Sequence, residues 1–300
     1  ALGLEASDIL PASTGVIGAQ LKMDLWEKAA PALAANLGKA TPEDFARAIM
    51  TTDAFHKISH REVSLPGGMV KLVGMAKGAG MICPNMATML SVVLCDAQVE
   101  ASVWQKMLRD AVELTFNRVT VDGDTSTNDT LYGLANGASG VSASDEESLK
   151  ALSAALTSVL GDLAYMLVKD GEGASKVARI HVTGAASGAD AERVARTVGH
   201  SQLVKTALYG RDANWGRIVA AVGRSGADFN PDDVVVTLCG VELFRKGQPT
   251  DLDFDALLEE PLKQRDLPID IVLGSGSGSY TLLASDLGHE YVNVNADYRS

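Results

Sequence analysis

A chain of 300 residues with 46% hydrophobic content can bury a large core, which indicates a globular protein of two domains or one large α/β domain. Its formal net charge of −12, with no Lys/Arg-rich block, disfavours nucleic acid and anionic lipid as partners. Its apolar stretches are interrupted well before the roughly 20 residues that span a bilayer. We therefore expect a soluble protein without a membrane span.

The three cysteines form no CxxC pair, so they predict neither a disulfide framework nor a zinc site, and a reducing compartment such as the cytoplasm is expected. The first residues have neither the basic nor the apolar region of a signal peptide. A chain that begins with Ala1 instead of Met is expected to be processed, trimmed or a fragment.

The first hundred residues predict two helices and a hairpin. Residues 24–38 have apolar side chains at helical spacing and end at a glycine. The Thr-Pro-Glu-Asp sequence at 41–44 supplies an N-cap, a first-turn proline and acidic residues, which predicts a second, shorter helix. Residues 63–75 alternate loosely around Pro66-Gly67-Gly68, which is typical of a hairpin.

The centre of the chain predicts a buried strand at 89–95, followed by a helix at 102–116. A long Ala/Leu-rich helix is predicted over 145–168, because acidic residues at its start and Lys169 at its end match the helix dipole.

From residue 177 onward strand patterns alternate with helical ones, which predicts a C-terminal α/β domain of residues 176–300 after a catalytic region of residues 1–175. The predicted strands are 180–182, 234–238, 269–273 and 291–294, and the predicted helices are 189–198 and 254–262.

Other patterns carry weaker hypotheses. His56 and His60 stand four residues apart, but without a third ligand they predict a polar surface segment, not a metal site. Residues 122–133 lack the glycine and the glutamate of a calcium loop. Gly274–Gly278 lacks the last glycine of a dinucleotide fingerprint and is expected to be a flexible turn. We expect three tryptophans to fill the core: Trp26, Trp104 and Trp215.

Thr88 stands where a glycine-rich loop gives way to an apolar strand. A threonine at this position is usually a strand former with a satisfied hydroxyl, and a threonine hydroxyl is a weak nucleophile that needs a base. If the Ala87–Thr88 peptide bond breaks, the freed α-amine of Thr88, with an ordinary pKa of about 8, can serve as that base.

The segments Lys77–Ile82 (KGAGMI) and Pro84–Leu90 (PNMATML) resemble the self-cleavage segment of ornithine acetyltransferases. Further segments are similar to motifs of that family in the same order, so that the resemblance extends over essentially the whole chain. These segments are 12–18 (ASTGVIG), 121–129 (VDGDTSTND), 170–174 (DGEGA), 214–217 (NWGR) and 295–299 (NADYR).

The resemblance implies that Thr88 attacks the acetyl carbonyl of N2-acetylornithine and that glutamate then takes the acetyl group from Thr88, in a ping-pong transfer without cofactor or metal. It implies cleavage between Ala87 and Thr88 and an oxyanion hole made by Thr14 and Gly15. The substrate-binding residues that it implies are Thr51 or Thr52, Lys77, Thr88, Glu172, Asn295 and Ser300. A lysine suits a carboxylate ligand, and a glutamate suits the ornithine ammonium.

The resemblance also implies an α/β (α+β) fold, a layered αββα sandwich with a smaller C-terminal α/β domain. An α chain of residues 1–87 and a β chain of residues 88–300 would pair into an α2β2 assembly. Two other interpretations stay open: a self-processing aminopeptidase or amidase, whose members favour a serine nucleophile and pass the acyl group to water, and a non-catalytic binding protein of the same fold. Whether acetyl-CoA is a second donor also stays open.

Overall fold

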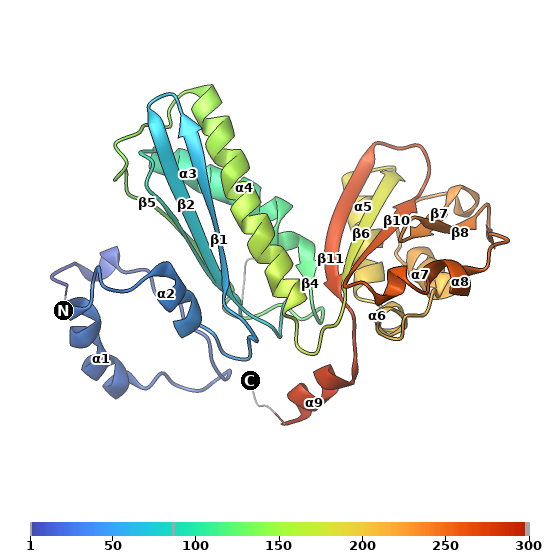
Figure 1. Ribbon diagram of the computed structural model, residues 1–300, viewed down its shortest axis with the longest axis horizontal. Coiled ribbons are helices and arrows are strands. Elements are labelled where there is room, and N and C mark those ends of the chain that lie inside the picture. The colour runs from blue at the N-terminus through green and yellow to red at the C-terminus, as the bar shows by residue number, and fades with distance from the viewer. Residues whose placement is uncertain (1, 86–87, 298–300) are drawn as a thin grey trace.

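The computed structural model describes residues 2–85 and 88–297 (Figure 1). The elements of the first half are η1 (Ala6–Asp8), α1 (Met23–Ala35), α2 (Pro42–Ala48), β1 (Lys57–Leu65), β2 (Gly68–Lys77), β3 (Leu90–Cys95), α3 (Ala101–Leu114), η2 (Phe116–Arg118), β4 (Val119–Thr120), β5 (Thr130–Ala135) and α4 (Glu146–Lys169). Those of the second half are β6 (Val177–Ala185), α5 (Gly188–Gly199), α6 (Gln202–Tyr209), α7 (Trp215–Gly223), η3 (Pro231–Asp233), β7 (Val235–Leu238), β8 (Val241–Arg245), β9 (Gln248–Pro249), α8 (Phe254–Leu258), η4 (Pro261–Lys263), β10 (Asp266–Val272), β11 (Gly278–Ser285) and α9 (His289–Asp297).

A four-stranded sheet with the order β1-β2-β3-β5 forms one side of the molecule. β1 and β2 are the expected antiparallel hairpin, β2 pairs antiparallel with β3, and β3 runs parallel to β5. The helix α4 lies across β1 and β2 (Figure 1). Gly74 of β2 permits this close approach, since an added Cβ would lie 2.6 Å from the Val159 side chain. The buried face of α4 repeats every three to four residues and includes Leu152, Leu156, Leu160, Leu163 and Leu167.

A seven-stranded mixed sheet with the order β4-β11-β6-β10-β7-β8-β9 forms the other side. β10 runs parallel to β6, while β11 and β7 pair antiparallel with their neighbours β6 and β10. The helix α5 packs on β11 and β6. The buried side chains form two clusters, which meet in the chain between Val177 and Ala178. The two sheets with their helices confirm the expected mixed α/β class, whereas the domain boundary near residue 175 stays a prediction.

Helix α4 is apolar enough to be compared with a membrane span. An 18-residue window of this 24-residue helix has a mean hydropathy of 1.6, which is enough by length and composition to cross a membrane, and it is the one such helix in residues 2–85 and 88–297. Asp162 interrupts the apolar run, which is why the sequence pattern looked shorter. The leucine face of α4 packs on the sheet, as in the core helix of a globular protein, so its composition does not identify a membrane span.

Two other expectations about elements are wrong. The expected strand at 291–294 lies within α9, where the Asn295 side chain donates to the Tyr291 carbonyl one turn earlier at 3.0 Å. Its valine and tyrosine residues favour strands, but they alternate with asparagines, and α9 forms no sheet pairing. The helix expected over 254–262 ends at Leu258, because Pro261 starts the separate turn η4.

The segment Gly274–Gly278 is not a flexible turn. It passes directly against the end of β6, and ideal Cβ atoms at Gly276 and Gly278 would overlap the backbone of Ala185 and Ser187. The glycines therefore permit two backbones to touch, which a sequence pattern alone does not distinguish from flexibility.

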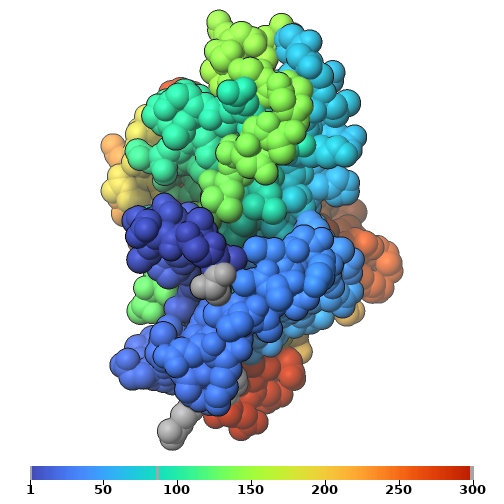
Figure 2. Space-filling view, turned by 90° about the vertical axis from the view of Figure 1, so that its left-hand side faces the viewer, coloured from blue at the N-terminus to red at the C-terminus, as the bar shows by residue number. Residues whose placement is uncertain are grey.

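The N-terminal segment, residues 2–44, lies on the outside of the molecule and covers much of one face (Figure 2). Helix α1 has no buried residue, and Trp26 is 52% exposed, contrary to the expectation that it fills the core. Of the other two tryptophans, Trp104 is buried, and Trp215 stacks on Phe244 with ring centroids 5.6 Å apart.

Candidate active site

One pocket brings together side chains from distant parts of the chain. It lies where the N-terminal segment, the end of β2, the loop after β4, the loop after α4 and helix α9 meet. Most of the predicted site residues line it: Thr14, Gly15, Thr51, Thr52, Lys77, Thr88, Glu172 and Asn295. The two remaining predictions, Ala87 and Ser300, lie outside the described residues.

Thr88 stands two residues before β3 and is half-buried. Its hydroxyl donates to the Ser126 hydroxyl at 2.5 Å, and Ser126 in turn donates to Oδ1 of Asn128 at 2.8 Å. The Thr88 carbonyl accepts a hydrogen bond from Nζ of Lys77 at 3.3 Å. These contacts hold the hydroxyl in place, and none of the described residues that line the pocket is a histidine that could act as its base.

The carboxylate of Asp129 contacts the residue that follows Thr88. Its Oδ1 accepts the backbone N–H of Met89 at 2.9 Å, and the side chain is largely buried. Its Oδ2 is also buried and accepts no hydrogen bond from the described part of the chain. Burial raises the pKa of Asp129 to about 6, against the opposing effects of the Met89 N–H, the Ser126 hydroxyl and the charge of Lys77.

Lys77, the last residue of β2, is only 1% exposed although its ammonium reaches the pocket. Burial lowers its pKa, and the carboxylates of Asp53, Asp129 and Glu172 oppose that shift. A buried ammonium at the wall of a pocket favours an anionic ligand, because such a ligand replaces the water that the cation has lost.

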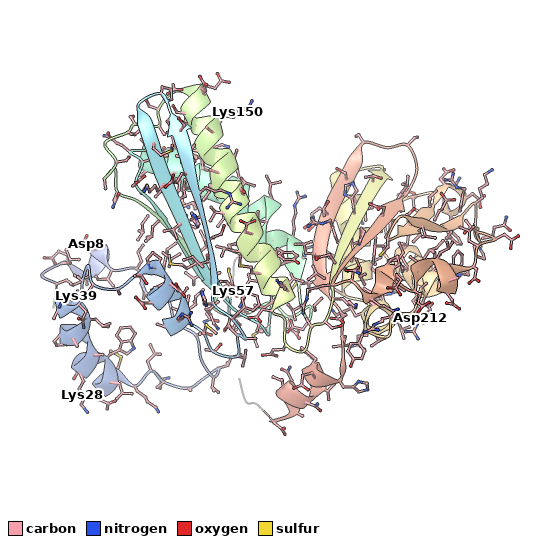
Figure 3. All side chains as sticks on the ribbon, in the orientation of Figure 1. Asp8, Lys28, Lys39, Lys57, Lys150 and Asp212 are labelled. Carbon is pink, nitrogen blue, oxygen red and sulfur yellow. The ribbon has the colours of Figure 1, made fainter. Side chains whose placement is uncertain are left out.

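A buried ionic triad lies behind this lysine. The ammonium of Lys57 donates to Asp53 at 2.6 Å and to Asp170 at 2.5 Å, and Figure 3 shows Lys57 at the start of β1 near α4. Asp53 also accepts the backbone N–H groups of Gly78 at 2.7 Å and Thr51 at 3.1 Å. The triad therefore ties together the loop after α2, the loop after β2 and the end of α4, which all carry pocket residues.

Glu172 follows α4 and faces helix α9. Its Oε2 accepts a hydrogen bond from the Asn295 amide at 2.8 Å, which joins two of the predicted substrate-binding residues. Gly80 makes room for this carboxylate, since an added Cβ would lie 2.5 Å from its carboxyl carbon. The side chain of residue 172 is thus held between α9 and the glycine-rich loop.

Thr14 and Gly15 reach the pocket on the N-terminal segment, where Thr14 is half-buried and Gly15 exposed. Two side chains attach this segment to the region around β5. The Asn128 amide donates to the Ser13 carbonyl, and the Tyr132 hydroxyl donates to the Pro11 carbonyl at 2.7 Å.

Asp122 shapes the glycine-rich loop that leads to Thr88. Its carboxylate accepts the backbone N–H groups of Met81 at 2.7 Å and Ile82 at 3.1 Å, and Met81 has a φ of 53°, in the left-handed region. Burial raises the pKa of Asp122, and the hydrogen bonds from these amides and from Asp124 oppose that shift.

The sequence interpretation missed the roles of the loop after β4 and of Tyr291. The pocket is also lined by Asp122, Asp124, Thr127 and Asn128. They lie in the segment 121–129, whose resemblance to a family motif and whose poor fit to a calcium loop do not predict this placement. Tyr291 also lines the pocket, which the sequence did not indicate because residues 291–294 were predicted to form a strand and not part of α9.

Comparison with known proteins identifies the family. The model of the ArgJ family matches residues 1–300. The chain belongs to the ArgJ family. The resemblance found in the sequence motifs is thereby confirmed.

Two ArgJ relatives are described as arginine biosynthesis bifunctional proteins. The protein from Nitratidesulfovibrio vulgaris is 72% identical over 300 residues, which are 100% of this chain and 76% of the relative. The protein from Syntrophotalea carbinolica is 46% identical over 301 residues, with 100% and 76% of the two chains covered. The crystal structure of the Bacillus halodurans protein of the same description is 34% identical, with a TM-score of 0.63, and the match covers 68% of this chain and 96% of that one.

Proposed function

We propose that this chain is an acetyltransferase of arginine biosynthesis, a glutamate N-acetyltransferase that moves the acetyl group of N2-acetylornithine to glutamate through an ester on Thr88. The observation that carries the proposal is the single pocket that unites Thr88 with a cation, Lys77, an anion, Glu172, and the Thr14–Gly15 pair. The names of the relatives, arginine biosynthesis bifunctional proteins, support the pathway.

The pocket groups suit each step of a ping-pong transfer. The Thr88 oxygen attacks the acetyl carbonyl while its proton passes to the α-amine of the same residue, and that proton leaves with the amine of ornithine. Donors from Thr14 and Gly15 stabilise the oxyanion, an effect worth about 3 kcal/mol for each donor. The glutamate amine then opens the ester and restores the hydroxyl of Thr88.

The charges of the pocket match the ends of an acetylated diamino acid. Lys77 can bind the α-carboxylate of either substrate, and Glu172, which is held by Asn295, can bind the distal ammonium of ornithine. Neither group has a use in holding water, so the pocket favours transfer over hydrolysis.

The match to the solved Bacillus halodurans chain covers 68% of this chain and 96% of that one, so the solved chain is the shorter of the two. A chain that begins after a cut would be shorter in the same way, which supports the proposed cleavage.

The proposed protein acts in the cytoplasm as an α2β2 assembly without cofactor or metal. The family resemblance supports the assembly, and the sequence, whose three cysteines form no CxxC pair, favours a reducing compartment.

The first test is the cut itself. We expect mass spectrometry of the purified protein to find two chains, the second beginning at Thr88, and to find Thr88→Ala as one intact chain. Thr88→Ser keeps a hydroxyl and should still be cut. A wild-type protein that is fully active but intact would rule out the α-amine mechanism.

The second test follows labelled acetyl from N2-acetylornithine with and without glutamate. We expect acetylglutamate to form far faster than free acetate, because a site built for transfer excludes water and aligns the acceptor amine. If acetate forms equally fast with and without glutamate, and no acetylglutamate appears, the protein is a hydrolase and not a transferase. Acetyl-CoA offered in the same assay shows whether it is a second donor.

A further inference from the structure

We propose that Asp129 is a positioning residue for the catalytic base: its Oδ2 accepts a hydrogen bond from the α-amine of Thr88 and stabilises the ammonium that forms there during acetyl transfer. This inference rests on the proposed cleavage before Thr88, because only cleavage creates that amine.

Backbone geometry brings Asp129 within reach of the Thr88 nitrogen. Oδ1 of Asp129 accepts the N–H of Met89 at 2.9 Å, and consecutive backbone nitrogens are roughly 3–3.7 Å apart. The parallel pairing of β3 with β5 keeps the two segments together, since the Thr130 N–H donates to the Met89 carbonyl at 2.8 Å. The carboxylate therefore lies one residue from the position where the new amine forms, and Oδ2 is its oxygen without a partner.

The unpaired Oδ2 points to a missing donor. Asp129 is 7% exposed, and no described residue donates to this oxygen. A buried acceptor without a donor is costly, and more so when it carries charge. Before cleavage the Thr88 nitrogen belongs to an amide with one N–H, whereas the free amine gains further N–H groups that can satisfy Oδ2.

The chemistry gives this contact a role in the first half of the transfer. When the Thr88 hydroxyl attacks, its proton moves to the α-amine, which becomes an ammonium beside the Asp129 carboxylate. The ammonium then gives that proton to the departing amine of ornithine, and Asp129 stays ionised throughout. A buried aspartate acts in the same way on the histidine base of serine hydrolases, where it orients the base and stabilises its charged form.

The surrounding charges make this carboxylate necessary. Lys77, whose ammonium contacts the Thr88 carbonyl, disfavours a second positive charge nearby. Asp129 ionises with a pKa of about 6, which keeps it charged at neutral pH to offset that repulsion. The other titratable groups that face this region are Asp122 and Asp124 from the loop after β4, Glu172 from the loop after α4, Tyr291 from α9, and Asp53 and Lys57 behind Lys77.

The decisive variant is Asp129→Asn, which keeps the acceptor for Met89 and replaces the Oδ2 acceptor by an amide donor. We expect the variant to be cut normally, its KM values to stay within about twofold, and its kcat to fall roughly tenfold to a hundredfold. The acid limb of its kcat/KM profile should move to lower pH, because the amine loses the carboxylate that raises its pKa. Asp190→Asn, a buried aspartate of α5, is the matched control and should leave the profile unchanged.

Three results would overturn the inference. If Asp129→Asn stays uncut, the carboxylate is needed for the cleavage itself, before the α-amine of Thr88 exists. A cut variant with wild-type kcat and pH profile would show that the amine does not need the carboxylate. The third result comes from the wild type and holds even where the variant does not fold. In protein labelled with ¹⁵N-threonine, NMR follows the α-amine of Thr88, which we expect to titrate above the ordinary pKa of about 8. Titration at or below that value contradicts the contact. If the wild-type protein is neither cut nor able to transfer acetyl, the proposed function is wrong. That outcome is distinct from the three results above, which contradict only the role of Asp129.

Discussion

At the residue scale, Gly80 is a position where an added side chain would displace Glu172. An added methyl would lie 2.5 Å from the carboxyl carbon of Glu172, and the flexible end of Glu172 can move away. We therefore predict that Gly80→Ala changes the free energy of unfolding by less than about 1 kcal/mol but raises the KM for N2-acetylornithine about tenfold, since Glu172 is moved from the position proposed to bind the substrate ammonium.

The control for this variant is Gly223→Ala, the same change at the end of α7, where an added Cβ meets no atom within 4 Å. Steady-state kinetics and urea unfolding of both variants separate displacement of Glu172 from a general effect of alanine. An unchanged KM in Gly80→Ala would remove Glu172 from the substrate site.

Lys77 allows a second prediction at this scale. Lys77→Met keeps most of the buried volume and removes the charge that is proposed to hold a carboxylate. One charged hydrogen bond is worth about 1.5–3 kcal/mol, so we expect kcat/KM to fall roughly tenfold to a hundredfold with both N2-acetylornithine and glutamate. Unchanged kinetics with both substrates would show that the carboxylate binds elsewhere, and circular dichroism checks that the fold is retained.

At the element scale, the triad of Lys57, Asp53 and Asp170 joins three loops of the site. Lys57→Met leaves two buried carboxylates without their cation, which should lower the free energy of unfolding by about 3–5 kcal/mol. Lys28→Met is the matched control, since Lys28 lies on the exposed face of α1 (Figure 3). Urea unfolding of the two variants measures the difference, and equal midpoints would mean that the triad contributes little.

Elements with a strong local pattern were predictable from the sequence, and elements defined by distant contacts were not. The helix at 145–168 has its caps and its apolar period in one segment, and the structure places α4 at Glu146–Lys169. By contrast, α9 is short and its residues favour strands, so its helical state could not be read from composition. Lys57 was missed because its partners are 4 and 113 residues away, and only the fold brings Asp170 to it.

The site shows the same division. Thr88 alone carried no signal beyond that of a strand start, and the family motifs supplied the hypothesis that the pocket now accommodates. The motif around Asp122 and Asp129 was visible, but the role proposed for Asp129 depends on its hydrogen bond to Met89, which sequence spacing does not reveal.

At the scale of the whole molecule, the four-stranded sheet crosses the proposed cut. β2 lies before Thr88 and β3 after it, and the two strands pair along six residues from Leu72 to Lys77. Both also pack in the same hydrophobic core. We therefore predict that the cut chains elute together in size-exclusion chromatography and separate only in denaturant, whereas chains that separate in native buffer would contradict this pairing.

The shared sheet also changes the molecularity of unfolding. A chain cut between β2 and β3 melts into two independent polypeptides, so mass action ties its melting temperature to protein concentration, and dilution lowers it. The intact Thr88→Ala chain releases one polypeptide per protomer on melting instead of two, so its melting temperature falls less steeply on dilution. Backbone cleavage thus makes the folding equilibrium depend more strongly on how much protein the cell contains.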